Sequence, residues 1–567
     1  MVDVTRNQAL VRDFLGLSLL IIAPAGCGKT ETLALRAKGL LSRQTVKAPQ
    51  RILVTTFTNR ARDNMRDRLS RYLTSREMRE AVTVHNFHGL SARIIQAHSN
   101  VIGLDPRVLT MPQSDWVGKR CREWGLIGKK INDVQSKISL AKRRGLTDEE
   151  VLEELERSGN QYALAIEAQR QSEGLLTYDD LPRLAELILA NDEVAALYQR
   201  HFGTIIVDEF QDLTPQQLRI VQRIGYKKTT YAGDLAQGIY TFAGAAPEYI
   251  KKQLEDECVE TIEFTESFRS SPAVLAAVNS LNGLTGGQTL AAADPNSWPS
   301  GGLAACLCFK DTNEEARYIT QFCQYVFSQE QASQPRIGIS ARSKQRRRFV
   351  DAAIADSGLP HCIWDDGVLD NSVVQKIKSM LRRLSLDEFH NAADPLGLLR
   401  QAVSLDSERD PDERTALSSA VDWCFDLLQE NVSPETIQKR IQIGGNDSLI
   451  TRSAVHLLTG HAGKGQQFDW MVVVGLEEGY LPSYYATQAG VSPAMLDEEA
   501  RTLAVMLSRA RHGVLATLSH VVPDDYNPKR VKQPSRFLAN LLPVVTSDDQ
   551  QIRDWLADVN WEAIAAK

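Results

Sequence analysis

The chain has 567 residues, of which 43% are hydrophobic and 24% charged, and its formal net charge at pH 7 is −6. This length allows roughly three or four domains, and the composition is that of an ordinary globular protein. The negative net charge excludes the class of nucleic-acid-binding proteins that are basic over their whole surface. Any surface of this chain that binds nucleic acid therefore has to be a local basic patch. Charged residues begin at the N-terminus and no apolar run is as long as a membrane span, which predicts a cytoplasmic protein with no membrane partner.

The eight cysteines include no C-x-x-C pair. That spacing is typical of zinc and iron–sulfur sites, and disulfide frameworks are typical of short secreted chains. We therefore expect reduced cysteines, in the core or at the surface of a cytosolic protein.

Residues 21–30, with the sequence IIAPAGCGKT, form a glycine-rich loop between two predicted elements. The apolar run 19–22 predicts a strand, and apolar residues at helical spacing from 33 to 41 predict a helix. Backbone N–H groups of such a loop, together with the N-terminus of the following helix, bind phosphate. Ala23 stands where the stricter form of the motif has its first glycine. The alternative, a surface turn before a helix, is disfavoured by the apolar strand, so we predict an ATP site.

Each residue type in this loop suits one part of a bound nucleotide. The glycines let the backbone close around phosphate oxygens. Lys29 supplies a positive charge for the β and γ phosphates, and the Thr30 hydroxyl can bind Mg²⁺. The predicted nucleotide contacts in the loop are Ala25, Gly26, Cys27, Gly28, Lys29 and Thr30.

A second apolar run, 204–207, ends in the paired carboxylates of Asp208 and Glu209. We expect Asp208 to bind Mg²⁺, directly or through water, and Glu209 to orient and deprotonate the attacking water. Adjacent acidic pairs are common on protein surfaces, but this pair follows a strand of the buried type and lies downstream of a phosphate loop. The pattern therefore predicts ATP hydrolysis.

Six segments match one family in the order of its motifs. They are GCGKT at 26–30, TTFTNRARDNMRDRL at 55–69, TVHNFHGL at 83–90, GDLAQGIYTFAGA at 233–245, EFTESFRS at 263–270 and LDEEARTLAVMLSRARHGVLAT at 496–517. Together they resemble the UvrD/Rep/PcrA family of superfamily 1 DNA helicases. The resemblance implies an α/β fold of two RecA-like parallel-sheet motor domains with mainly helical insertions, and ATP in the cleft between the domains. It also implies 3′ to 5′ movement along single-stranded DNA.

Further nucleotide contacts follow from the resemblance. Gln237 is expected to sense the γ-phosphate, and Arg269 and Arg509 to act as arginine fingers. Phe268 is expected to stack on adenine, although most members have Tyr there. Gln467 occupies the position of a family Glu that binds the ribose. Gln8, upstream of the first strand, is in place to read the adenine edge, but most such glutamines are solvated.

The resemblance also implies a DNA path. Relatives usually have Trp at the Phe242 position and Arg at the Ala243 position, so one contact of the path is missing here. Tyr526, in a hairpin-like stretch, is the candidate for a pin that splits the duplex. The other residues expected along the single strand are Phe57, His88, Tyr240, Phe242 and His461.

A basic stretch from 116 to 144 carries nine Lys and Arg residues, interleaved with aromatic residues. Such a surface suits a nucleic acid backbone and its bases. The cluster of Lys142, Arg143 and Arg144 is the predicted DNA contact, and a solvated helix face is the equally weighted alternative.

The predicted organisation alternates motor segments and insertions. The second insertion is shorter than the helical subdomain that relatives have in that place, which predicts different regulation. The expected segments are 1–95 and 186–272 for the first motor domain, 96–185 for a basic helical insertion, 273–384 and 450–545 for the second motor domain, 385–449 for the reduced insertion and 546–567 for a tail.

Two functions remain open at this point. The first is an ATP-dependent helicase or translocase acting on single-stranded and tailed duplex DNA. The second is an ATPase and DNA-sensing subunit that serves a nuclease partner in DNA repair or phage defence. The reduced insertion and the departures at Ala243 and Gln467 keep the second open as the alternative to the first.

Overall fold

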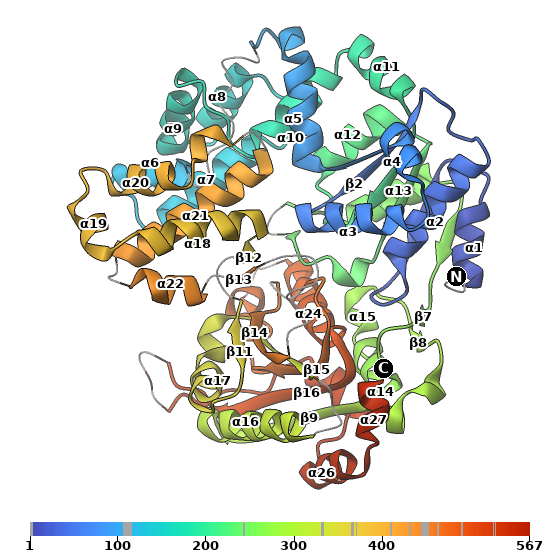
Figure 1. Ribbon diagram of the computed structural model, residues 1–567, viewed down its shortest axis with the longest axis vertical. Coiled ribbons are helices and arrows are strands. Elements are labelled where there is room, and N and C mark those ends of the chain that lie inside the picture. Colours follow the sequence, from blue (N-terminus) through green and yellow to red (C-terminus); the bar gives the residue numbers. More distant parts are fainter. Residues whose placement is uncertain are drawn as a thin grey trace.

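The structure is a computed structural model of the chain (Figure 1). It describes residues 4–105, 116–241, 244–329, 334–364, 368–369, 371–408, 411–429, 432–440, 442–443, 453–461, 464–488, 492–524, 527 and 529–566. Two α/β domains lie one above the other, and two helical lobes project from the same side of the pair (Figure 1). This arrangement confirms the predicted α/β class with helical insertions.

The first domain is built on a parallel sheet of six strands in the order β3-β2-β4-β5-β1-β6. Its central strands β1, β2, β4 and β5 are largely buried on both faces, as a parallel sheet covered by helices requires, whereas the edge strand β6 is exposed. They are β1 (Leu19–Ile22), β2 (Arg51–Thr56), β3 (Val82–Asn86), β4 (Phe202–Asp208), β5 (Thr229–Gly233) and β6 (Thr261–Glu263).

Helices cover both faces of this sheet and bury two separate apolar clusters. One face carries α1 (Arg6–Asp13), α2 (Lys29–Ser42), α3 (Asn59–Ser70) and α4 (Ser75–Ala81). The other carries α5 (Phe87–His98), α10 (Asp180–Leu189), α11 (Asp192–His201), α12 (Pro215–Gly225) and α13 (Pro247–Glu257).

The second domain repeats the plan with six parallel strands in the order β11-β14-β10-β15-β16-β9. The strands are β9 (Leu303–Asp311), β10 (Arg336–Ala341), β11 (His361–Ile363), β14 (Ala454–Thr459), β15 (Phe468–Val474) and β16 (Ala510–Val521). One face is covered by α16 (Thr312–Ser328), α17 (Lys344–Asp356), α26 (Asp549–Asp558) and α27 (Trp561–Ala565). The other is covered by α14 (Pro272–Asn279), α24 (Pro493–Leu507) and α25 (Leu538–Leu541).

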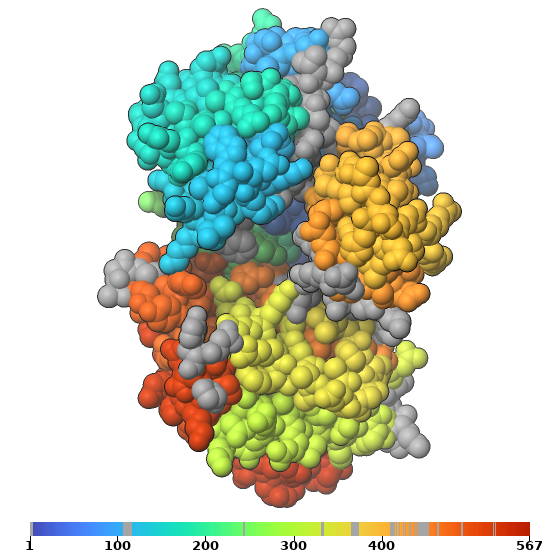
Figure 2. Space-filling model, turned by 90° about the vertical axis from the view of Figure 1, so that its left-hand side faces the viewer, coloured from blue at the N-terminus to red at the C-terminus, as the bar shows by residue number. Residues whose placement is uncertain are grey.

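Each helical lobe has an apolar core of its own, and the two lobes lie side by side on one face of the molecule (Figure 2). The first lobe consists of α6 (Trp116–Glu123), α7 (Lys129–Ala141), α8 (Asp148–Arg157) and α9 (Gln161–Ser172). The second consists of α18 (Asn371–Arg383), α19 (Leu386–Asn391), α20 (Pro395–Ala402), α21 (Pro411–Gln429) and α22 (Pro434–Arg440).

The lobes differ from the expected segments at their edges. The boundary expected at 185 falls inside α10, whose Leu181 and Leu184 pack in the core of the first domain. The second lobe begins at α18 and not at 385, because Ile377 packs in the core of that lobe. The expected tail is part of the second domain, where Trp561 packs against its sheet.

None of the eight cysteines is in a disulfide, and six of them are buried. Among the helices in the described part of the chain, none has the length and apolarity needed to cross a membrane.

Candidate nucleotide and DNA site

The glycine loop lies where β1 ends and α2 begins, at the carboxyl edge of the first sheet. Gly28 caps α2 with φ of 77°, and Gly26 has φ of 86°. A Cβ on Gly26 would lie 2.6 Å from the Cβ of Arg269, so only glycine allows this close approach. The cradle that a phosphate needs is therefore built by two residues in the left-handed region.

Lys29 contacts both carboxylates that follow β4. Its Nζ lies 3.1 Å from Oδ1 of Asp208 and 2.5 Å from Oε2 of Glu209. Burial raises the pKa of Asp208 against the pull of Lys29. Burial also opposes ionisation of Glu209, but Lys29 and Lys464 outweigh it and lower the pKa of Glu209 to about 2. Glu209 is therefore a carboxylate at neutral pH.

The backbone of Glu209 is held in a conformation that is rare for a residue with a side chain, with φ of 58°. Such strain costs about 1–3 kcal/mol and concentrates at functional sites. Gln211 holds the side chain in place, because its Nε2 donates to Oε2 of Glu209 at 2.5 Å. The Oε1 of Gln211 accepts from the Asp234 amide at 3.0 Å, and Gln237 donates to the Asp234 carboxylate at 2.8 Å. This chain of bonds joins the ends of β4 and β5.

Lys464, to which sequence reasoning assigned no role, connects the two domains. Its Nζ donates to both carboxylate oxygens of Asp212 at 2.7 Å and to the carbonyl of Gln237 at 2.8 Å. It also lies 4.7 Å from the ring centroid of Tyr240, a cation–π contact. The available signal was a lysine in the glycine-rich loop after β14, but its partner lies 252 positions away.

Two arginines, Arg269 and Arg509, face the same region, and neither makes an ion pair with a residue that the structure describes. Nη2 of Arg509 is buried and has no hydrogen-bond partner within the described residues. Burial and the nearby charge of Arg269 lower the pKa of Arg509 to about 9. Burial lowers the pKa of Arg269 to about 10. Two cations in a poorly solvated site are stabilised by an anion, so the residues present fit a polyphosphate.

One cavity of about 690 Å³ lies between the domains. The charged side chains described above that line it are Lys29, Asp208, Glu209, Asp212, Arg269, Lys464 and Arg509. This volume lies in the range of small-molecule sites. Thr30 and Asp208 both line it, and a hydroxyl and a carboxylate are oxygen ligands of the kind that Mg²⁺ prefers. The predicted residues that line the cavity are Gln8, Ala25, Gly26, Gly28, Lys29, Thr30, Phe57, Asp208, Glu209, Gln237, Tyr240, Phe268, Arg269, Gln467 and Arg509.

Cys27 departs from this set. Its side chain is buried in the apolar cluster under the sheet, and its amide donates to the Pro24 carbonyl at 3.2 Å. The side chain of Cys27 is therefore structural, and a nucleotide contact at Cys27 stays a prediction. Sequence reasoning also missed Arg68 and Arg511, which line the cavity.

Three rings expected on the DNA path form a row across the cleft. Phe57 stacks on Tyr240 with centroids 5.4 Å apart and planes 18° apart. The Tyr240 centroid lies 6.4 Å from that of His461, which comes from the second domain. Burial and the charge of Arg342 lower the pKa of His461 to about 4, so it is neutral at pH 7. The ring of His88 packs edge-on against Tyr178, with centroids 5.4 Å apart.

The basic cluster of the first lobe is divided by the structure. Lys142 is fully buried, with its Nζ 2.9 Å from Oε2 of Glu167 and 2.9 Å from Oδ2 of Asp180. The prediction that it contacts DNA is wrong, because two buried carboxylates neutralise it. Arg144 is exposed, and the guanidinium of Arg143 lies against Gly244.

Two predicted DNA contacts, Phe242 and Tyr526, lie outside the described residues.

Comparison with known proteins gives matches along most of the chain. The family model of the UvrD/REP helicase N-terminal domain matches residues 4–257, and that of the UvrD-like helicase C-terminal domain matches residues 373–519. The ATP-dependent DNA helicase UvrD2 of Mycobacterium tuberculosis is 25% identical over 93% of this chain and 80% of its own length. PcrA of Leuconostoc citreum is 23% identical over 93% and 83%, and DNA helicase II of Escherichia coli is 24% identical over 92% and 85%.

Proposed function

This chain belongs to the UvrD-like helicase family, and from that premise we propose that it hydrolyses ATP to move 3′ to 5′ along single-stranded DNA and to separate duplex strands. One observation carries the proposal. Lys29, Glu209 and Arg509, from two different domains, line one cavity. A nucleotide bound there contacts both domains, so its hydrolysis changes how tightly they are held together.

The chemical step follows from the charges around the cavity. Lys29 binds β- and γ-phosphate oxygens, and the ionised Glu209 takes a proton from a water molecule. The oxygen of that water attacks the γ-phosphorus as the bond to the β–γ bridging oxygen breaks, which releases ADP and phosphate. Arg269 and Arg509 neutralise the charge that develops on the transferred group. Mg²⁺, held by Thr30 and Asp208, would neutralise phosphate charge.

The outer part of the cavity suits the nucleoside. Phe268 is 54% exposed, and its amide donates to the Gly26 carbonyl at 3.0 Å, so its ring stays beside the phosphate loop. We assign the adenine to this ring and to the amide of Gln8. Gln467, at the rim contributed by the second domain, is assigned to the ribose hydroxyls.

The coupling to DNA is assigned to the contacts of Tyr240. This ring stacks on Phe57 in one domain, faces His461 in the other and lies under the ammonium of Lys464. Lys464 in turn contacts the backbone of Gln237, the expected sensor of the γ-phosphate. Opening or closing of the cleft therefore changes the spacing of the rings on which DNA bases stack.

The test is strand displacement by the purified chain on duplexes with a 3′ or a 5′ single-stranded tail, with ATP turnover measured in parallel. We expect DNA-stimulated turnover and displacement of the duplex with the 3′ tail. Lys29→Ala is the matched control, which must lose both activities. Equal displacement from both tails would contradict the direction, and ATP turnover that ignores DNA would contradict the proposal as a whole.

A second function is favoured by the small size of the second lobe, whose helices among the described residues are α18 to α22. In this alternative the chain is an ATPase and DNA-sensing subunit of a nuclease complex in repair or phage defence. DNA-stimulated turnover without displacement from either tail would support it over the first.

A further inference from the structure

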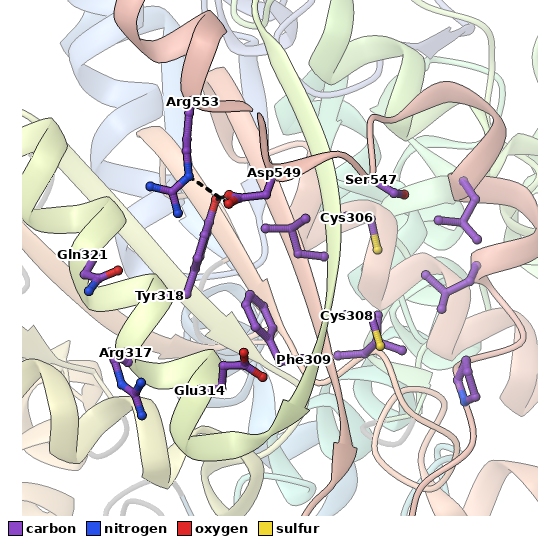
Figure 3. A pocket seen from close by; sticks show the side chains of 15 residues that line it. Cys306, Cys308, Phe309, Glu314, Arg317, Tyr318, Gln321, Ser547, Asp549 and Arg553 are labelled. Carbon is purple, nitrogen blue, oxygen red and sulfur yellow. Dashed lines mark hydrogen bonds and ion pairs between the residues drawn. The ribbon is translucent and has the colours of Figure 1, made fainter. Parts of the chain in front are cut away.

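A groove of about 780 Å³ follows the outer edge of the second sheet and shares no lining residue with the nucleotide cavity. The strand at this edge is β9, which is last in the strand order. Tyr318 and Phe309 lie on one side of β9 in Figure 3. Cys306 and Cys308 lie on the other side. The groove therefore has two walls, with the strand edge between them.

The backbone of this edge is only partly paired. Thr546 receives a hydrogen bond from the Cys306 amide at 2.8 Å and donates to the Ala304 carbonyl at 3.0 Å. Further along, the Lys310 amide donates to Oε2 of Glu314 at 2.8 Å. By the alternation of a strand, the carbonyl of Cys306 and both backbone groups of Cys308 face the same edge. In the part of the chain that the structure describes, no strand pairs with them, and such an edge is a template for another strand.

The two walls offer complementary places for alternating side chains. The aromatic wall holds Phe309 and Tyr318 with centroids 5.3 Å apart, and the Tyr318 hydroxyl donates to Asp549 at 2.6 Å. The opposite wall is aliphatic and includes Leu538 and Leu542, of which Leu542 is 45% exposed. Successive residues of an added strand point to opposite faces, so they would enter the two walls in turn.

The charges of the groove define the partner further. Glu314 is bonded to the Lys310 amide, and Asp549 pairs with Arg553 at 2.8 Å. The groove has four charged lining residues, Glu314, Arg317, Asp549 and Arg553, and the structure describes all four. Among the described residues, Arg317 is exposed and makes no ion pair. Glu314 makes no ion pair within the described residues either, so the four charged lining residues leave the groove without a net charge. Such a groove does not suit a nucleic acid, whose backbone needs several phosphate contacts. The exposed guanidinium of Arg317 suits one carboxylate on a peptide.

We propose that the open edge of β9 binds an extended peptide segment of a partner protein, which adds a strand to the second sheet and places an acidic residue against Arg317. This inference does not rest on the proposed helicase function, because the groove and the nucleotide cavity are separate.

The test starts from a phage library of random linear dodecapeptides selected on the immobilised full chain. Enriched peptides are synthesised with a fluorescein label, and their binding is measured by anisotropy. We expect apolar residues at alternate positions with an acidic residue beside them. Two variants remove the proposed contacts: Cys308→Pro deletes an outward-facing amide that the sheet does not use, and Arg317→Glu reverses the unmatched charge. Each should weaken binding by about tenfold or more.

Lys252→Glu, the same charge change at an exposed position on α13, is the matched control and should bind as the parent does. If Cys308→Pro shows a lowered melting temperature, Leu542→Lys replaces it as the second groove variant. DNA-stimulated ATP turnover should equal that of the parent in every variant, which separates this test from that of the helicase function.

Three results would overturn the inference. One is a selection that enriches no peptide. Another is parent-like affinity of the enriched peptides for Arg317→Glu. The third is a concentration-dependent dimer of the chain that Arg317→Glu abolishes, since that would assign the edge to a second copy.

Discussion

Replacing Lys464 with Met should uncouple the two domains. The ammonium lies between Asp212, Gln237 and the ring of Tyr240, and the pair is buried, with side-chain exposures of 9% for Lys464 and 2% for Asp212. Breaking a buried pair inside one domain costs about 3–5 kcal/mol. Here the cleft can open, and water can then solvate the Asp212 carboxylate that Lys464→Met leaves unpaired. The free energy lost is therefore only that of the charge-assisted hydrogen bonds, about 1.5–3 kcal/mol.

That free energy favours the closed cleft, so its loss should shift the balance between closed and open forms by roughly 10- to 150-fold. The same change should appear in ATP turnover stimulated by single-stranded DNA, because Lys29 and Arg509 meet only when the cleft is closed. The assay is a double-mutant cycle in kcat/KM with Lys464→Met, Asp212→Asn and the double variant. We expect each single variant to lose most of the stimulation of ATP turnover by DNA. The double variant should lose little more than either single variant.

A second ion pair across the same cleft provides the matched control. Arg501 contacts Glu248, but the Glu248 side chain is 66% exposed, so this pair should be worth about 0–1 kcal/mol. Arg501→Met with Glu248→Gln should therefore show a small coupling energy. Effects of Lys464→Met and Asp212→Asn that simply multiply would refute the reasoning, because they would show that the contact does not hold the cleft closed.

Four further outcomes are expected. Glu209→Gln should bind ATP in a filter assay but not turn it over, and a parent-like rate would remove Glu209 from the role of base. Arg509→Ala should cut turnover by about 10³-fold, by analogy with other arginine fingers, and leave ATP affinity within about tenfold. Lys142→Met should lower the free energy of unfolding by about 3–5 kcal/mol, because it leaves buried carboxylates unpaired, whereas Arg144→Ala should leave it unchanged and flatten the salt slope of DNA binding by about 0.7. His461 has a pKa of about 4 in the folded chain, below its usual 6.5. Between these two pH values the folded chain therefore binds fewer protons than the unfolded chain, and it loses stability as pH falls through that window. His461→Leu should lose less free energy of unfolding between pH 7 and pH 5, as measured by urea denaturation at the two pH values.

The parts of the site that the sequence predicted are those in which neighbouring residues act together. The loop at Gly28 and Lys29 forms a cradle of the shape that a phosphate needs, and Asp208 with Glu209 follows one strand directly. Their geometry is set by a few consecutive residues, so a motif describes it fully. The strand-loop-helix context predicted the ATP site, and the resemblance to the helicase family implied the parallel sheets.

The parts that the sequence did not predict depend on residues far apart in the chain. The charge count around Lys142 was correct, but it did not show that Glu167 and Asp180 would be folded against the ammonium. The partner of Lys464 comes from the other domain. The edge of the first lobe was misplaced because α10 is amphipathic, and its apolar stripe would suit a lobe or a domain core equally.

The order of the strands has a consequence for synthesis on the ribosome. All six strands of the first sheet lie between Leu19 and Glu263, and the cluster beneath it also takes in Trp298. The second sheet needs β16, and its core is covered only when Trp561 has been made. The first domain can therefore fold while most of the second is still untranslated, as multidomain chains generally do. During that interval the half-built cleft, with Lys29, is exposed to chaperones and nucleotide alike.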